Sequence, residues 1–297
     1  MRADVKWTNL SRRRIARKIT ELGTPVGRDV VSQLLRKHRY RRRKAQKKKT
    51  MGRRHPDRNA QFENIARLKK EYLQAGWPVI SVDTKKKELL GDFYRDGVID
   101  AQETIATNDH DFGSAGGGTV IPHGIYDVGR NAGYIHLNTS HDTSELACDS
   151  IAAWWEGPGR AAYPGAQKLL VLCDGGGSNG ATRYVFKEGL QKLADRLGPE
   201  IRVAHDPPYC SKYNPIEHRL FPHVTRACRG VIFRALETVR YYMSKAETGT
   251  GLTVQVRILE KVYPTGRKCA AGFKKSMKIV FDELLPKWNY TAVPQPV

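Results

Sequence analysis

The most constraining feature of this sequence is an apolar run that closes on an aspartate. Residues 168–174 read KLLVLCD, and three glycines follow directly. An apolar run without alternation is typical of a strand that is buried on both faces of its sheet. The run therefore predicts a sheet covered by helices on both sides, which is the arrangement of an α/β domain.

The segments around this run alternate between strand-like and helix-like patterns, which indicates an α/β fold with a mixed sheet. Residues 87–93 are expected to pair antiparallel with residues 78–84, and residues 95–123 to form a long loop. Asp142 is expected to cap the helix that follows it. The strands are expected at 78–84, 87–93, 123–128, 133–138, 168–174, 201–206 and 252–259, and the helices at 59–75, 143–157, 181–198, 214–224 and 236–249.

Positive charge is concentrated at the start of the chain. Of 51 Lys+Arg, 21 lie in residues 1–58, where only four acids occur. Such an asymmetry points to a polyanionic partner, nucleic acid first and an anionic membrane second. No uncharged apolar window of 18 residues occurs, so no membrane span is expected. The five cysteines form no C-x-x-C pair, which favours a reducing cytoplasm.

Residues 1–40 predict a small all-α module. Ser11 caps a first helix that stops at Gly23, and a second helix spans about residues 27–38 with Val30, Val31, Leu34 and Leu35 inward. Two short helices joined by a tight turn suit a helix-turn-helix, although an ordinary helical hairpin remains the alternative. Two helices make a small core, so a further helix is expected ahead of Met1. The candidate DNA contacts on the second helix are Arg28, Ser32, Gln33, Arg36 and Lys37.

Residues 41–58 form a basic linker that cannot fold alone and is expected to follow DNA phosphates, beginning with Arg41, Arg42 and Arg43. Residues 59–297 then form the second domain.

Three acids in the second domain are candidate catalytic residues. Asp83 and Asp174 each end a predicted strand, and ligands bind at the carboxyl ends of strands in open α/β sheets. Glu217 lies in the first turn of a helix that Asn214 and Pro215 begin. The alternatives to a catalytic role are purely structural: Asp174 would be a turn aspartate, and Asn214 and Glu217 would form a capping box.

Three carboxylates from two strand ends and one helix start would suit two Mg²⁺ or Mn²⁺ ions, because hard cations prefer oxygen ligands. Two such ions stabilise the attacking and leaving oxygens of a phosphoryl displacement. Lys85, Lys86 and Lys87 follow Asp83 and would either hold a phosphate or form a solvated basic loop. Lys212 would either contact DNA or fix its own loop.

Several blocks of the sequence resemble one family of transposases in content and in order. They are VISVDTKKKELLGDF, GIYDVGRNAGYI, HDTSELACDSI, CDGGGSNG, SKYNPIEHRLF, TGLTVQVRIL, YPTG and WNYT, and they span roughly residues 55–291. The set resembles the ISAzo-type insertion-sequence transposases, the Rhodopirellula-type DDE transposase family. The resemblance implies an RNase H-like catalytic domain whose metal-binding triad is Asp83, Asp174 and Glu217. It also implies a prokaryotic, nucleoid-associated protein.

The resulting expectation is a DNA transposase that cleaves double-stranded DNA at element ends and transfers the freed strand to a target. Bringing two ends together requires at least a dimer, so a homo-oligomer is expected. Two alternatives remain open at this point: a catalytically inactive, element-derived DNA-binding protein such as a repressor, and an RNase H-like nuclease without strand transfer.

Overall fold

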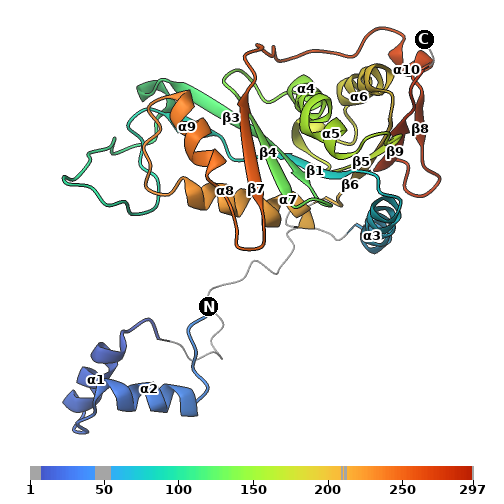
Figure 1. The fold of residues 1–297 in the computed structure, drawn as a ribbon. Helices are drawn as coiled ribbons and strands as arrows, with labels where there is room; N and C mark the ends of the chain where they lie inside the picture. Colours follow the sequence, from blue (N-terminus) through green and yellow to red (C-terminus); the bar gives the residue numbers. More distant parts are fainter. Residues whose placement is uncertain (1–7, 44–54, 209, 211–212, 296–297) are drawn as a thin grey trace. The chain divides into compact units, whose positions relative to one another are not determined.

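The computed structural model describes residues 8–43, 55–208, 210 and 213–295. The chain divides into two compact units, Met1–Met51 and Gly52–Val297, which are drawn in Figure 1 and are treated separately below. Residues 44–54 of the expected basic linker, and Lys212, lie outside the described residues.

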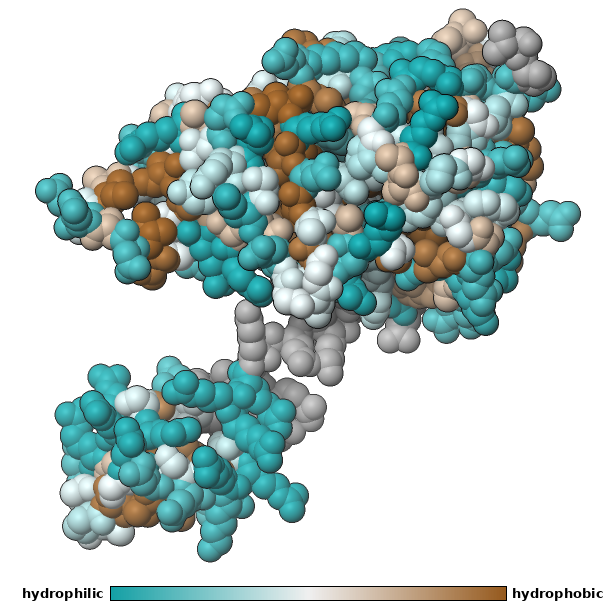
Figure 2. Space-filling model, in the orientation of Figure 1, coloured by the Kyte–Doolittle hydropathy of each residue, from teal (hydrophilic) through white to brown (hydrophobic). Residues whose placement is uncertain are grey.

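The described residues of the N-terminal unit form two helices, α1 (Arg12–Glu21) and α2 (Arg28–Lys37). The predicted start of α1 is confirmed, because the Ser11 hydroxyl accepts a hydrogen bond from the Arg14 N–H at 3.3 Å. Val31 is buried as predicted, but the inward placement of Val30 and Leu34 was wrong, since both are exposed. Two helices shield only one side of each other, so apolar side chains remain on the otherwise hydrophilic surface of this unit (Figure 2).

The larger unit is built on one mixed sheet of nine strands. Its order is β7-β4-β3-β1-β5-β6-β9-β8, with β2 paired to β3. The strands are β1 (Val79–Thr84), β2 (Glu88–Leu90), β3 (Gly118–Asp127), β4 (Ala132–Asn138), β5 (Lys168–Cys173), β6 (Glu200–His205), β7 (Thr253–Ile258), β8 (Ile279–Phe281) and β9 (Asn289–Ala292).

Helices cover both faces of this sheet, as the apolar run at residues 168–174 predicts. Figure 1 shows α4, α5 and α6 on one side and α3, α7 and α8 on the other. Leu169 and Val171 of β5 pack in the core under α4 and α6, whereas Leu170 and Leu172 pack against α3. The helices are α3 (Arg58–Gln74), α4 (Ser144–Trp154), α5 (Arg160–Ala162), α6 (Tyr184–Leu197), α7 (Pro215–Arg219), α8 (Phe221–Ala227), α9 (Leu236–Ser244) and α10 (Phe273–Ser276). None of the helices in the described ranges combines the length and the apolar character that crossing a membrane requires.

Two sequence expectations about the sheet need correction. Residues 88–90 do form a strand, but β2 pairs antiparallel with β3 rather than with β1. The antiparallel neighbour of β1 is β3 itself, which begins at Gly118, inside the segment expected to be a loop. The short strands β8 and β9 were not predicted. Β9 pairs with β6 and buries Tyr290, so the sheet extends past the expected edge.

A pair of buried histidines makes the stability of this sheet sensitive to acid. His123 of β3 and His136 of β4 lie opposite each other, and burial lowers the pKa of His123 to about 4 and that of His136 to about 3. Below about pH 6.5 these histidines are protonated in the unfolded chain but stay neutral in the folded chain. The free energy of unfolding therefore falls as the pH is lowered, until the folded-state pKa is reached. We expect each histidine to contribute a loss of about 1.4 kcal/mol per pH unit in this window.

The measurement is chemical denaturation of wild type and His123→Leu between pH 7.5 and pH 4.5. The variant should lose stability less steeply, and His110→Gln, which changes an exposed histidine, should follow wild type. The comparison between proteins is the decisive quantity, because burial raises the pKa of Asp83 and Asp206 and acts in the opposite direction. Identical slopes for wild type and His123→Leu would contradict the prediction.

Candidate active site

Asp83 and Asp174 lie side by side at the carboxyl edge of the sheet. Strands β1 and β5 are parallel and in register from Val79 with Leu170 to Val82 with Cys173, so the next residues, Asp83 and Asp174, are neighbours. Adjacent strands are about 4.8 Å apart. Both side chains extend from the face that α3 and α7 cover, because side chains alternate along a strand. The register of two apolar strands therefore places two carboxylates next to each other.

Glu217 reaches the same place from a helix. Helix α7 begins at Pro215 and packs against β1, and the Glu217 side chain is close enough to Asp83 to form a hydrogen bond that raises the Asp83 pKa. The capping box weighed above does not form, because the side chain of Asn214 makes no capping hydrogen bond. The three candidate acids are thus brought together.

Burial raises the pKa of both aspartates, and at Asp83 the neighbouring acids raise it further. Burial, followed by the negative charge of Asp174, raises the pKa of Asp83 to about 8, although the Thr84 N–H donates to its carboxylate at 2.7 Å. Burial also raises the pKa of Asp174, against a hydrogen bond from the Gly176 N–H at 3.3 Å. No described cation forms an ion pair with Asp83, Asp174 or Glu217.

A cavity of about 230 Å³ opens beside these strand ends. Asp83, Asp174 and the glycine-rich segment 176–179 line it, together with Asp142. The expectation that Asp142 caps α4 was wrong. Thr143 is the N-cap, and its hydroxyl accepts a hydrogen bond from the Leu146 N–H at 3.2 Å. Asp142 instead accepts a hydrogen bond from the Thr84 hydroxyl at 3.1 Å and is the third carboxylate that lines the cavity, whereas Glu217 does not line it.

The donor set fits a hard divalent cation. It consists of carboxylate oxygens, which Mg²⁺ and Mn²⁺ prefer, and a cation would offset the burial and the negative charge of Asp174 that raise the Asp83 pKa. Within the described residues no three His, Cys, Asp or Glu side chains are already arranged around one position for an ion. The carboxylates therefore suit a divalent cation in their chemistry and in their common location, but they do not form a ready-made coordination shell.

A family model for the Rhodopirellula transposase DDE domain matches residues 1–294 of the chain. The chain belongs to this family. The resemblance stated from the sequence blocks is thereby confirmed.

Three solved structures of Mos1 transposase are also similar to this DDE transposase family member. They are a paired-end complex with the left transposon end (14% identity, TM-score 0.48), a mariner paired-end complex with Mn (13%, 0.46) and one with Mg (14%, 0.47). Each match covers 79% of this chain and 65% of the Mos1 chain. The chain thus spans slightly less than two thirds of those proteins. No curated protein matches it.

The three lysines after Asp83 differ in this family member. Lys85 is buried, and its ammonium donates to Glu88 at 2.6 Å. Lys86 and Lys87 are exposed, and all three lysines line the same cavity as Asp83 and Asp174. A phosphate in the cavity would therefore meet Lys86 and Lys87 rather than the paired Lys85.

The candidate DNA contacts of the N-terminal unit are mostly exposed. Ser32 is the exception, since it is half-buried and its hydroxyl donates to the Arg28 carbonyl at 3.1 Å. Arg28 also pairs with Asp29 at 3.3 Å. The exposed positions are Arg28, Gln33, Arg36, Lys37, Arg41, Arg42 and Arg43.

Sequence reasoning missed Asp206, which lies beside the triad. It directly follows β6, whose register with β5 places it next to Asp174. Asp206 is buried, its Oδ2 has no hydrogen-bond partner among the described residues, and burial together with the charge of Asp174 raises its pKa to about 7. Its position matches that of Asp174 on the neighbouring strand, so strand register was the signal that could have found it.

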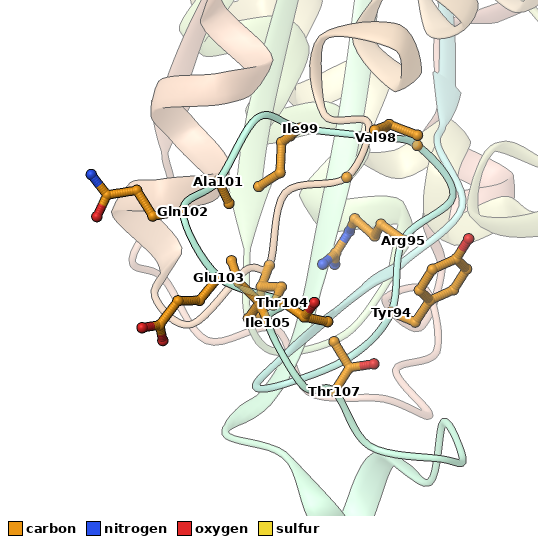
Figure 3. Close-up of a pocket in the computed structure, with 13 residues that line it drawn as sticks. Tyr94, Arg95, Val98, Ile99, Ala101, Gln102, Glu103, Thr104, Ile105 and Thr107 are labelled. Carbon is orange, nitrogen blue, oxygen red and sulfur yellow. The ribbon is translucent and has the colours of Figure 1, made fainter.

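A larger cavity, of about 420 Å³, shares no lining residue with the acidic one. It lies within the loop between β2 and β3 and is closed by Gly230 and Ile232 after α8. Figure 3 shows Arg95 directed into this loop and Glu103 directed away from it. Arg95 donates to the carbonyls of Leu89 and Val231 and lies 3.6 Å above the Phe233 ring, so its guanidinium anchors the loop.

Proposed function

We propose that this chain is a DDE transposase that hydrolyses a phosphodiester at the ends of its element and joins the freed 3′-hydroxyl to target DNA. The observation that supports this most is the adjacency of Asp83 and Asp174 on one face, with Glu217 reaching Asp83 from α7. The strand order β4-β3-β1-β5-β6, antiparallel on one side of β1 and parallel on the other, agrees with an RNase H-like catalytic domain.

Asp83, Asp174 and Glu217 would hold two Mg²⁺ or Mn²⁺ ions. When bound, such ions supply positive charge to the attacking and leaving oxygens of the displaced phosphate. The chain's own residues position the reactants. Lys86 and Lys87 attract the phosphate, and Gly176 and Gly177 let the DNA backbone approach without obstruction by side chains.

The proposed partners are double-stranded DNA, as element end and as target, and a second copy of the chain. The N-terminal unit would grip DNA as a helix-turn-helix, through phosphates first and with limited base readout from α2. The proposed location is the nucleoid of a prokaryotic cell.

The test is incubation of the protein with a labelled duplex that carries an element end, with Mg²⁺, with Mn²⁺ and with EDTA. A transposase gives metal-dependent nicks and joined products in which the 3′ end is linked to a second duplex. Nicks without joined products would indicate a nuclease, and salt-sensitive binding without nicks would indicate an inactive DNA-binding protein. Either outcome would overturn the proposal.

The basic segment after α2 is expected to set the salt dependence of DNA binding. Each phosphate contact contributes about 0.9 to the slope of log K against log salt concentration. Replacing Arg41, Arg42 and Arg43 with Gln should therefore lower the magnitude of this slope by up to about 2.7. Filter binding or fluorescence anisotropy from 50 to 300 mM salt measures the slope.

A charge-matched control replaces three arginines of the larger unit with Gln. Arg196, Arg234 and Arg240 are suitable because each already pairs with a carboxylate on the surface. The control should keep the wild-type slope. An equal decrease in both triple variants would show that net charge, and not the segment after α2, governs binding.

A further inference from the structure

A buried polar contact joins the strand that carries Asp83 to the helix that carries Glu217. Ser81 of β1 and Asn214 are both fully buried. The Ser81 hydroxyl donates to the Asn214 side-chain oxygen and accepts a hydrogen bond from the Ile216 N–H at 3.0 Å. The Asn214 amide donates in turn to the Val82 carbonyl at 3.4 Å. Three hydrogen bonds thus connect β1 and α7.

This arrangement replaces the ordinary cap of α7. The first N–H groups of a helix lack partners within the helix, and the side chain of the N-cap residue usually satisfies one of them. Here the N-cap Asn214 makes no such bond, and the hydroxyl of Ser81 satisfies the Ile216 N–H from a different element. Sliding or rotating α7 would leave these buried polar groups unpaired, which is unfavourable.

The contact is also close to the acids in sequence. Ser81 precedes Asp83 by two residues and lies on the same face of β1, since side chains alternate along a strand. Asn214 precedes Glu217 by three residues, less than one helical turn. The linkage therefore constrains the two backbones from which Asp83 and Glu217 extend.

We propose that Ser81 and Asn214 are positioning residues, which fix Glu217 relative to Asp83 without contacting DNA or metal themselves. The inference rests on the proposed function, in which Asp83 and Glu217 hold an ion. It assigns to the asparagine of the segment NPIE a role in locating the helix, and to a strand serine the role of the cap.

The test compares Ser81→Ala, Asn214→Ala and the double variant. Misplacing a reacting group by about 1 Å lowers a rate by about 10²-fold, so we expect each single variant to cleave an element-end duplex 30- to 100-fold more slowly. DNA affinity should stay unchanged. Mn²⁺ affinity without DNA, measured from the electron paramagnetic resonance of free Mn²⁺, should fall about tenfold for both. The double variant should cleave no more slowly than the slower of the two single variants, because both residues act through one linkage.

The matched control is Ser150→Ala, which removes the hydroxyl of another fully buried serine, one that has no partner among the described residues. It should retain wild-type cleavage and Mn²⁺ affinity. Ser81→Thr keeps a hydroxyl at position 81 and should recover most of the rate, whereas a merely structural defect would persist.

Wild-type rate and Mn²⁺ affinity in folded Ser81→Ala and Asn214→Ala would overturn the positioning role. So would additive losses in the double variant. If Ser81→Ala does not fold, Asn214→Ala still tests the positioning role, because it shortens a side chain outside β1 and leaves the strand unchanged. Failure of the wild-type protein to cleave DNA with any metal overturns the proposed function instead, and the two failures are therefore distinguishable.

Discussion

Replacing Asp174 with Asn is expected to lower metal-dependent cleavage of an element-end duplex at least about a thousandfold, which corresponds to about 4 kcal/mol of transition-state stabilisation. Asn keeps the size of the side chain but removes the charge that would hold a cation beside Asp83. Folding should not suffer, since burial already raises the Asp174 pKa and disfavours its charged form. Single-turnover cleavage assays with Mg²⁺ and Mn²⁺, together with thermal denaturation, measure both quantities.

The control for this prediction is Asp109→Asn, which makes the same change in charge at a highly exposed aspartate of the β2–β3 loop. It should cleave at the wild-type rate. DNA binding by Asp174→Asn should equal or exceed that of wild type, because a negative charge has been removed near the phosphate path. Equal cleavage by Asp174→Asn and wild type would remove Asp174 from the active site.

Replacing Gly124 with Val is expected to destabilise the larger unit and to inactivate it. Gly124 of β3 lies opposite Asp83 in the sheet, and a Cβ there would be 2.6 Å from the Phe221 ring and 2.9 Å from Ile216. Overpacking of a core costs about 1–3 kcal/mol, and relief of the clash requires α7 and α8 to move away from the sheet. Because Ile216 adjoins Glu217, this movement should slow cleavage about 10²-fold even in the folded fraction.

Urea denaturation and cleavage at a temperature well below the melting transition separate the two effects. The matched control is Gly117→Val near the start of the same strand, where a Cβ would meet only atoms at ordinary contact distance, 3.8 Å or more. It should be close to wild type in both assays. A folded Gly124→Val protein with full activity would show that the approach of α7 to β3 is not required.

The position of the two aspartates could be predicted because strand register follows from simple patterning. An uninterrupted apolar run indicates a strand buried on both faces, and the residue that ends it must lie at the edge of the sheet. Asp174 ends such a run, Asp83 lies near the end of the alternating segment 78–84, and the structure places the two side by side. Asp206 likewise ends a predicted strand, residues 201–206, but was not among the candidate acids.

The surroundings of Glu217 could not be predicted, because they depend on contacts between residues far apart in sequence. Asn214 and Glu217 have the spacing of a capping box, a local pattern, yet the partner of Asn214 is Ser81, 133 residues earlier. Asp142 was likewise expected to cap α4 because it precedes a helix, but Thr143 competes for the same role and leaves Asp142 for Thr84. A local sequence pattern therefore predicts the wrong hydrogen-bond partner when a residue distant in sequence offers another one.

The last strand has a consequence for synthesis of the protein. Asn289, at the start of β9, exchanges hydrogen bonds with Gln61 of α3, 228 residues earlier, and β9 covers the edge of β6. A ribosome that has translated only as far as α9 therefore carries a nascent chain in which α3 lacks this anchor and β6 is an open edge. We expect the larger unit to reach its final form only after Asn289 has left the exit tunnel.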